Sequence, residues 1–253
     1  MHGLARHAAL SVSRAIRRGS SWPCVVRTEA GDFLTKLRGA AQGVLPLIAE
    51  IIVGELATAL GLPVPERVVV SLDDDTPSED RNDELADLLH RSAGANLGFR
   101  FLPGAVDLTL DRLSAVPEDV GATILWLDGL VMNPDRTPRN PNVLLWHRQP
   151  WLIDHGAALP FHYDLGALTE QTARETSFDW RGHLFEARAA RAAELDAACA
   201  AKISRDVLAN AASVVPDEFI ATAFPGMGPA TVRGMYTAVL WKRLKAPRAF
   251  LPL

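Results

Sequence analysis

The segment from residue 133 to 156 constrains the fold of this chain more than any other, and it reads NPDRTPRNPNVLLWHRQPWLIDHG. It begins with a proline-rich loop that contains Asp135 and Asn140. Two short apolar runs follow, NVLLW and PWLID, and they predict a β-hairpin. A solvated turn needs small polar residues, but it does not need an apolar hairpin that brings a further carboxylate, Asp154, back toward it. The segment therefore predicts a polar site where Asp154 meets the loop.

The composition allows a sizeable core and argues against several classes of partner. With 253 residues, 48% of them hydrophobic, the chain can form one large domain or two small lobes. A net charge of -4 provides no general basic field, so no nucleic-acid partner is expected. No apolar run reaches the roughly 18 residues of a membrane helix, so no membrane partner is expected either. Cys24 and Cys199 lie far apart, without the spacing of a zinc site or a disulfide framework, and this favours a cytoplasmic location.

The first hundred residues predict mainly strands. The first 28 residues are basic and are expected to form a basic helix or arm, with a transit peptide as the alternative. A helix is predicted from Pro46 to the stop signals Gly61 and Pro63. An acidic stretch at 73–84 predicts an exposed connection. Short strands are expected at residues 23–28, 32–37, 67–72 and 98–102.

The remainder of the chain predicts mainly helices. An apolar helix is expected at 119–132, followed by the loop and hairpin described above. Alanine-rich segments at 186–203 and 231–244 also predict helices. The change in texture places a boundary near residue 103, which gives a small strand-rich lobe at 1–103 and a mostly helical lobe at 104–253. The predicted fold class is α+β.

Taken singly, each candidate site residue has an ordinary structural explanation. Lys36 could be a surface lysine and Glu50 a solvated helix-face carboxylate. The sequence DRTPRN could be a simple turn, and Asp154 could cap the next segment. Three histidines lack tight metal-binding spacing and are expected to be packing or loop residues: His155, His162 and His183.

Their order along the chain favours a phosphoryl-transfer site. A strand lysine, a helix glutamate, an Asp-(four residues)-Asn loop and an Asp-x-Gly after a hairpin occur in that sequence. The chemistry needs a cation to hold phosphates, a carboxylate to hold that cation, a base near the acceptor hydroxyl, and oxygen ligands for magnesium. Asp154 would then return to help Asn140 hold a metal near Asp135.

With these motifs the chain resembles the HipA-like kinases, within the protein-kinase-like fold. The resemblance is carried by GSSWPCVVRTEAGDFLTKLRG, AEIIVGELATALGLPVP, NPDRTPRNPNVLLW and WLIDHGAAL, and it spans about residues 19 to 163. It implies a two-lobed fold, ATP as a substrate, dependence on Mg²⁺, and a serine or threonine acceptor in a protein. Beyond Tyr163 the chain matches the family only in being predicted helical, and no motif matches.

The resemblance also implies roles for individual residues. Lys36 would bind the phosphates, and Glu50 would be its helix partner, with Glu55 as the competing choice. Asp135 would be the catalytic base. Asn140 and Asp154 would be the magnesium ligands, with Asn142 in reserve for Asn140. The phosphate-covering loop, whose serines can be autophosphorylated in relatives, would be Gly19, Ser20 and Ser21.

The chain departs from eukaryotic protein kinases in three places. It lacks a full G-x-G-x-x-G loop, Asn133 and Pro134 precede Asp135 in place of His-Arg, and His155 replaces the Phe of Asp-Phe-Gly. The chain also looks too short for the extra amino-terminal subdomain of toxin kinases, which argues against a toxin role and an antitoxin partner. Two other functions remain open, a small-molecule or lipid kinase and a non-catalytic nucleotide-binding pseudokinase.

Overall fold

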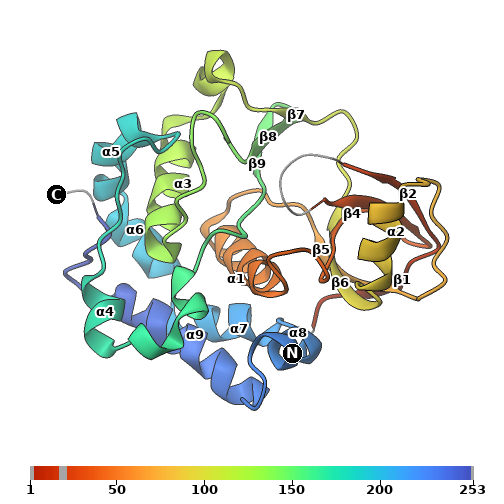
Figure 1. Ribbon diagram of the computed structural model, residues 1–253. Coiled ribbons are helices and arrows are strands. Elements are labelled where there is room, and N and C mark those ends of the chain that lie inside the picture. The colour runs from red at the N-terminus through yellow and green to blue at the C-terminus, as the bar shows by residue number, and fades with distance from the viewer. Residues whose placement is uncertain (1–2, 17–21, 252–253) are drawn as a thin grey trace.

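The computed structural model describes residues 3–16 and 22–251 of the chain, and the first half of this part is built around a curled sheet (Figure 1). The six strands of this sheet are β1 (Arg6–Ala8), β2 (Ser11–Ala15), β3 (Cys24–Thr28), β4 (Gly31–Lys36), β5 (Arg67–Leu72) and β6 (Gly94–Arg100). They are arranged in the order β1-β5-β6-β4-β3-β2. All pairs are antiparallel except β1 with β5.

The β3–β4 hairpin places Lys36 at the end of a central strand. The hairpin closes where Thr28 pairs with Gly31, whose φ of 109° suits glycine because an L side chain would be strained there. On its other side β4 pairs with β6, so that Lys36 lies opposite Leu97. Both strands were predicted from the sequence, and their positions are confirmed.

One expectation for this half was wrong. The basic amino-terminal segment was expected to be a helix or arm, but Arg6–Ala8 and Ser11–Ala15 form strands β1 and β2, and Val12 of β2 is buried in the core between the sheet and helix α2 (Asp83–His90). The acidic stretch at 73–84 was predicted to be an exposed connection, and most of its residues are exposed. Its last two residues begin α2, since the Asn82 side chain accepts the Leu85 N–H as an N-cap.

Helix α1 (Leu45–Leu60) is the element that joins the two halves of the molecule. Pro46 occupies its first turn, and Gly61 ends it in a left-handed conformation with φ 87°, as the sequence predicted. Most of its residues are buried, so it is apolar on nearly every face. Figure 1 shows α1 beside the sheet, and it also contacts helices of the second half.

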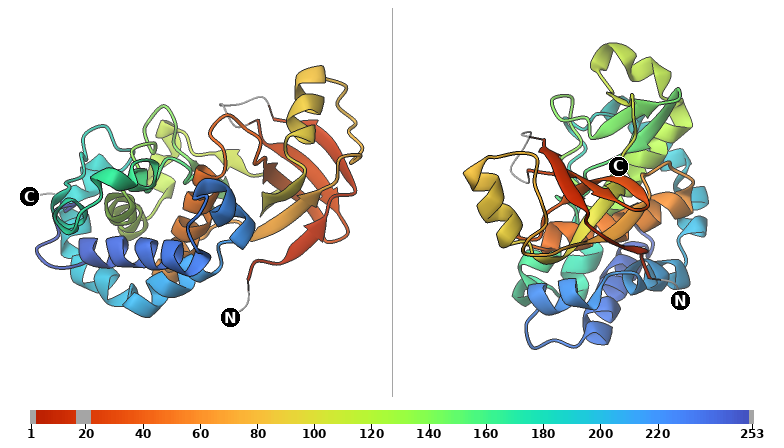
Figure 2. Two further views of the ribbon diagram at one scale, coloured as in Figure 1. Left: turned by 60° about the horizontal axis from the view of Figure 1, so that its bottom comes forward. Right: turned by 90° about the vertical axis from the view of Figure 1, so that its right-hand side faces the viewer.

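The second half is mostly helical, which confirms the predicted α+β class with a strand-rich part and a helical part. Figure 2 shows the helices gathered on one side and the sheet on the other. In the described residues the α-helices of this half are α3 (Glu118–Val131), α4 (Glu170–Glu175), α5 (Ala189–Glu194), α6 (Asp196–Lys202), α7 (Arg205–Ser213), α8 (Asp217–Ala223) and α9 (Pro229–Arg243). The short 3₁₀ helices are η1 (Leu110–Ala115), η2 (Pro160–Tyr163), η3 (Leu165–Ala167) and η4 (Glu186–Arg188).

A small second sheet carries the loop and hairpin with which the sequence analysis began. Its strands are β7 (Val106–Asp107), β8 (Val143–Trp146) and β9 (Gln149–Leu152), in the order β7-β8-β9. The predicted hairpin is therefore confirmed. The backbone N–H of Leu152 donates to the carbonyl of Pro63, just beyond α1. This bond brings the end of β9 close to the helix that carries Glu50.

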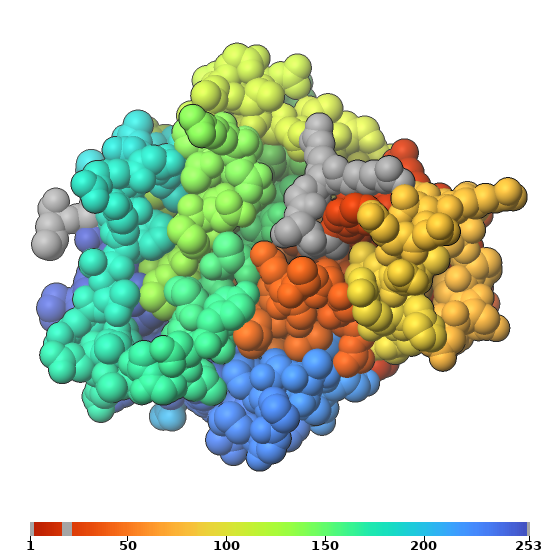
Figure 3. All heavy atoms as spheres, viewed as in Figure 1, coloured from red at the N-terminus to blue at the C-terminus, as the bar shows by residue number. Residues whose placement is uncertain are grey.

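The buried apolar residues form two clusters. The smaller lies between the main sheet and α2, with Phe33 and Val70 among its members. The larger extends from α1 through α3 to the carboxy-terminal helices and includes Trp126 and Phe250. Figure 3 shows the surface of α1, in orange, between the sheet and the helical part. The predicted lobe boundary at 103 falls in the segment between β6 and β7, and the division into lobes 1–103 and 104–253 stays a prediction.

Within residues 3–16 and 22–251, no helix has both the length and the apolar character that crossing a membrane requires.

Candidate active site

The candidate site is a cleft of about 1000 Å³ lined by both halves of the molecule. Lys36 and Phe99 come from the main sheet, and residues 101–102 and 104–105 come from the segment that crosses to the helical half. Asp135 and Asp154 line the same cleft from the helical half. Residues distant in sequence thus meet around one space that is large enough for a nucleotide.

Lys36 is held by two carboxylates. Its Nζ lies 2.5 Å from Oε1 of Glu50 on α1 and 2.7 Å from Oδ1 of Asp154 after β9. Burial alone would lower the pKa of Lys36, but the attraction of Glu50 and Asp154 outweighs burial and raises the pKa, so that the lysine carries its charge. Glu55 lies elsewhere and pairs with Arg67 at 2.6 Å. In the structure the helix partner of Lys36 is therefore Glu50.

The two carboxylates beside Lys36 have different environments. The Glu50 side chain is fully buried, and burial raises its pKa although Lys36 opposes the shift. Its Oε2 is buried without a hydrogen-bond partner. Burial would also raise the pKa of Asp154, but attraction by Lys36 outweighs this and lowers the pKa. Because the side chain of Asp154 is 45% exposed, it can present an ionised oxygen to the cleft.

The backbone next to Asp154 allows this close approach to α1. Asp154 itself has φ 55°, a left-handed conformation that is uncommon for a residue other than glycine. A Cβ added at Gly156 would lie 3.1 Å from the side chain of Pro46 and 3.6 Å from Oε1 of Glu50. The glycine of the Asp-x-Gly sequence thus permits tight packing of this segment against the first turns of α1.

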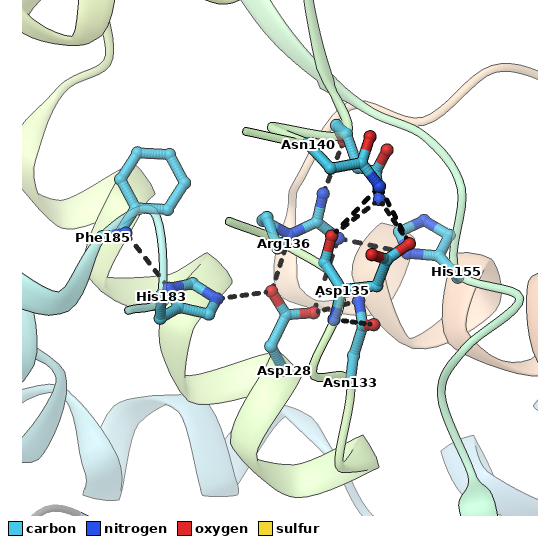
Figure 4. Close-up of polar contacts among 9 residues, drawn as sticks. Asp128, Asn133, Asp135, Arg136, Asn140, His155, His183 and Phe185 are labelled. Carbon is cyan, nitrogen blue, oxygen red and sulfur yellow. Dashed lines mark hydrogen bonds and ion pairs between the residues drawn. The ribbon is translucent and has the colours of Figure 1, made fainter. Parts of the chain in front are cut away.

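Asp135 is oriented by three asparagines (Figure 4). Its backbone N–H donates to Oδ1 of Asn133 at 3.2 Å. Its Oδ2 accepts from Nδ2 of Asn140 at 2.9 Å and from Nδ2 of Asn142 at 3.3 Å. Asn142 also donates to the backbone carbonyl of Asp135 at 3.0 Å. The carboxylate is fixed in direction yet only partly buried, so an incoming hydroxyl could reach it.

The oxygens around the cleft suit a hard cation. Asp154 offers a carboxylate, while Asn140 and Asn142 use their amide nitrogens toward Asp135 and keep their amide oxygens for another partner. Among the residues that the structure describes, no three His, Cys, Asp or Glu side chains gather into a metal site. Mg²⁺ does not require such a group, because it commonly takes one or two carboxylates and completes its shell with phosphates and water. The residues present therefore fit magnesium.

Under the loop that carries Asp135 lies a buried polar cluster that the sequence analysis missed. Asp128 on α3 and Arg136 in the loop are fully buried, and Arg136 Nε donates to Asp128 Oδ2 at 2.6 Å. His183, from a distant loop, lies 3.0 Å from the same oxygen. Burial would raise the pKa of Asp128, but Arg136 and His183 outweigh it and hold the pKa well below its usual range. Asp128 is the one acid in the otherwise apolar run 124–132, and this was the signal available in the sequence.

The three histidines expected to serve packing are all buried. Burial lowers the pKa of His155 to about 3 and that of His162 to about 4, so both rings are neutral at physiological pH. His155 also lies 3.4 Å from a guanidinium nitrogen of Arg136, and His183 contacts Asp128 as described above. Two of the three thus belong to the polar cluster, a part that the sequence analysis did not foresee.

The structure thus brings most of the predicted site residues into two adjacent groups on one cleft. Lys36 and Glu50 meet Asp154, and Asp135 meets Asn140. The predicted phosphate-covering loop, Gly19, Ser20 and Ser21, lies outside the described residues.

Comparison with known proteins assigns a family to this arrangement. The model of one protein family, described as HipA-like kinase, matches residues 10–222, which is most of the chain and includes both groups of site residues. No curated protein matches the sequence.

Proposed function

Because the chain belongs to the HipA-like kinase family, we propose that it transfers the γ-phosphoryl group of ATP, with Mg²⁺, to a serine or threonine hydroxyl of a protein, itself included. One observation carries the proposal. Lys36, paired with Glu50, and Asp135, oriented by Asn140, line the same cleft of about 1000 Å³. This arrangement supplies a cation for phosphates and a base for an acceptor at one site.

Lys36 is proposed to contact the phosphates of ATP. The buried Glu50 holds its ammonium group from the α1 side, as a kinase requires of this pair. The second contact of the ammonium group, with Asp154, is made by an exposed carboxylate that can turn toward the cleft. The cation is therefore already placed at the cleft wall before a nucleotide arrives.

Asp135 is proposed to accept the proton of the acceptor hydroxyl. The amide groups of Asn140 and Asn142 direct its carboxylate, and a fixed direction favours proton transfer in the transition state. Asp154 and the amide oxygen of Asn140, or of Asn142, would hold magnesium. When bound, magnesium neutralises charge on the phosphates.

A cytoplasmic location is part of the proposal. It is supported by Cys24 and Cys199, which are buried free thiols, as expected in a reducing compartment.

The function is tested by incubating the purified protein with labelled ATP and magnesium, then locating the transferred phosphate by mass spectrometry. We expect label on serine or threonine of the protein itself or of an added protein, and at least about 100-fold slower labelling with the Asp135→Asn variant. Nucleotide binding without any transfer would support the pseudokinase alternative. Transfer only to metabolites or lipids would show that the acceptor class is wrong. Absence of both ATP and ADP binding by calorimetry would contradict the proposal as a whole.

A further inference from the structure

The loop that carries Asp135 rests on a buried ion pair, Asp128 and Arg136, neither of which lines the cleft itself. Arg136 follows Asp135 in the chain, yet its side chain is fully buried beneath the loop (Figure 4). Its Nε donates to Oδ2 of Asp128 at 2.6 Å, and another guanidinium nitrogen lies 3.4 Å from Oδ1. Moving two charges out of water costs free energy that offsets their attraction. The presence of a buried ion pair is therefore weak evidence that the pair stabilises the fold.

From Asp128, two separate routes of hydrogen bonds reach Asp135. In the first, Nδ2 of Asn133 donates to Oδ1 of Asp128 at 3.0 Å, and Oδ1 of Asn133 accepts the backbone N–H of Asp135 at 3.2 Å. In the second, Arg136 donates to the backbone carbonyl of Asn142 at 2.5 Å, and the Asn142 side chain donates to Asp135. The loop is therefore held on both sides of its carboxylate.

The same guanidinium group also reaches the segment that carries Asp154. A nitrogen of Arg136 lies 3.4 Å from Nδ1 of His155, the next residue after Asp154. A guanidinium group can only donate hydrogen bonds, so the buried His155 ring accepts this one at Nδ1. The Arg136 side chain thus contacts both Asn142, which donates to Asp135, and His155, which follows Asp154.

His183 fixes the orientation of Asp128 from a third direction. Its Nδ1 accepts the backbone N–H of Phe185 at 3.1 Å, which places the ring hydrogen on Nε2. Nε2 then donates to Oδ2 of Asp128 at 3.0 Å. In addition, the backbone N–H of Leu184 donates to the carbonyl of Arg136 at 2.9 Å. Residues 183–185 therefore clamp both members of the ion pair.

We infer that Asp128 and Arg136, fixed by His183, are positioning residues that hold Asp135 and the Asp154 segment in the relative placement needed for phosphoryl transfer. The inference rests on the proposed kinase function and adds residues that act through Asp135 and Asp154 without touching the nucleotide. A base displaced by about 1 Å can lose on the order of 100-fold in rate, so small changes in this support should be measurable.

The test uses pairs of variants that differ in one hydrogen bond. His183→Asn keeps an acceptor near the Nδ1 position for Phe185 but is too short to donate to Asp128. His183→Gln is long enough to place a donor near the Nε2 position and serves as the conservative rescue. Arg136→Lys keeps the charge but cannot make all the contacts of the guanidinium fork. The matched controls are His90→Asn and Arg181→Lys, because both side chains are exposed.

We expect His183→Asn and Arg136→Lys to lower kcat by roughly 10- to 100-fold while KM for ATP changes by less than about threefold. His183→Gln should recover most of the loss, and both controls should resemble the original protein. Full kcat in a folded His183→Asn variant would overturn the inference. Equal losses in the Asn and Gln variants, with KM raised in parallel, would also overturn it. If Arg136→Lys fails to fold, the two His183 variants decide.

Amide hydrogen exchange gives a second measurement that does not depend on turnover. We expect His183→Asn to speed exchange in residues 133–142 while leaving α1 unchanged, since a merely structural defect would speed both. If the original protein transfers no phosphate, the proposed function fails, and this measurement still judges the positioning role. Unchanged exchange at 133–142 would then overturn it.

Discussion

Asp135 and Asp154 line one cleft but differ in their partners, and this difference predicts distinct effects of the same substitution. The Asp135 carboxylate accepts hydrogen bonds from side-chain amides, whereas the Asp154 carboxylate accepts one from the ammonium group of Lys36. Asp135→Asn should leave ATP affinity nearly unchanged and lower turnover by roughly 100- to 10,000-fold, as expected for loss of a positioned base. Asp154→Asn should also weaken the dependence of ATP binding on magnesium, because a neutral amide is a poorer ligand for a hard cation.

These roles are measured by titrating ATP binding against magnesium concentration for each variant, beside a phosphorylation assay. A substitution of the exposed Asp179 by Asn provides the control for losing one carboxylate. Equal loss of metal-dependent binding in both cleft variants would show that the two roles are misassigned. Full activity of Asp135→Asn would remove it as the base.

The buried His162 ring should make the free energy of unfolding depend on pH, independently of catalysis. Its ring is 2% exposed, one nitrogen lies 2.9 Å from the hydroxyl of Tyr236, and burial lowers its pKa from 6.5 to about 4. The unfolded chain therefore takes up a proton at higher pH than the folded protein does. The stability that neutral His162 provides is complete above about pH 6.5 and is lost toward pH 4, at about 1.4 kcal/mol per pH unit.

His162→Gln should make the decline in the free energy of unfolding between pH 6.5 and pH 4.5 shallower by about 2 to 3 kcal/mol. Urea denaturation at a series of pH values measures this, with His90→Gln at an exposed position as the matched control. The same flattening in both variants would contradict a specific contribution from the buried ring.

The residues of the candidate site were predictable to the extent that the chemistry depends on their order along the chain. The order of a strand, a helix, a loop and a hairpin along the chain pointed to one candidate residue in each, namely Lys36, Glu50, Asp135 and Asp154. The support formed by Asp128 and His183 was not found, because these residues are 55 positions apart and meet only through packing of the tertiary structure. The sequence marks Asp128 as an acid within an apolar run, but it carries no signal that His183 is its partner.

At the scale of elements, glycine favours stability at the end of a helix but lowers it in the interior of a helix. Gly61 ends α1 with φ 87°, where alanine would be strained even though a Cβ would meet nothing within 4 Å. Gly234 lies exposed within α9, and a Cβ there would also meet nothing within 4 Å. We expect Gly61→Ala to lower the free energy of unfolding by about 1 kcal/mol. Gly234→Ala should raise it by about 0.5 to 1 kcal/mol.

Urea denaturation of the two variants measures both changes, and each serves as the control for the other because the substitution is identical. A shift of both midpoints in the same direction would show that backbone conformation does not decide the effect at these positions.

The elements themselves were predictable where local signals were strong. Helix α1 has a proline start and a glycine stop, and the hairpin β8–β9 has two apolar runs around a short turn. The alanine-rich segment 186–203 was expected to be helical throughout, but the structure divides it into η4, α5 and α6. Asp196 begins α6, and its carboxylate accepts from Trp126 and Arg248. These distant contacts, absent from the local pattern, fix the chain at the division.

At the scale of the whole molecule, α1 couples the sheet to the helical half. The larger core cluster contains Ile52 of α1 together with Val69 and Leu97 of the sheet and Trp126 of α3. The cleft is lined from both halves as well. Because apolar residues of the sheet and of the helical half share one core with α1, we expect the molecule to unfold in one cooperative transition.

A nucleotide bound in this cleft should therefore raise the melting temperature of the whole protein. ADP with magnesium at about 100 times Kd stabilises a binding-competent fold by about 2.7 kcal/mol, and for a chain of this size that corresponds to an increase in Tm of about 5 to 10 °C. Lys36→Met should reduce the shift at the same concentrations, because it removes a charge-assisted contact. Lys245→Met, on the exposed end of the helical half, should retain the shift.

Differential scanning calorimetry with and without ADP and magnesium tests this directly, and a chelator provides the metal-free arm. The expected result is one transition that moves as a unit and moves less when magnesium is removed. Two transitions, of which only one responds, would show that the sheet and the helical half unfold separately. A full shift in Lys36→Met would exclude the lysine from nucleotide binding, since the contact that joins the strand β4 to the phosphates would then contribute nothing to the stability of the complex.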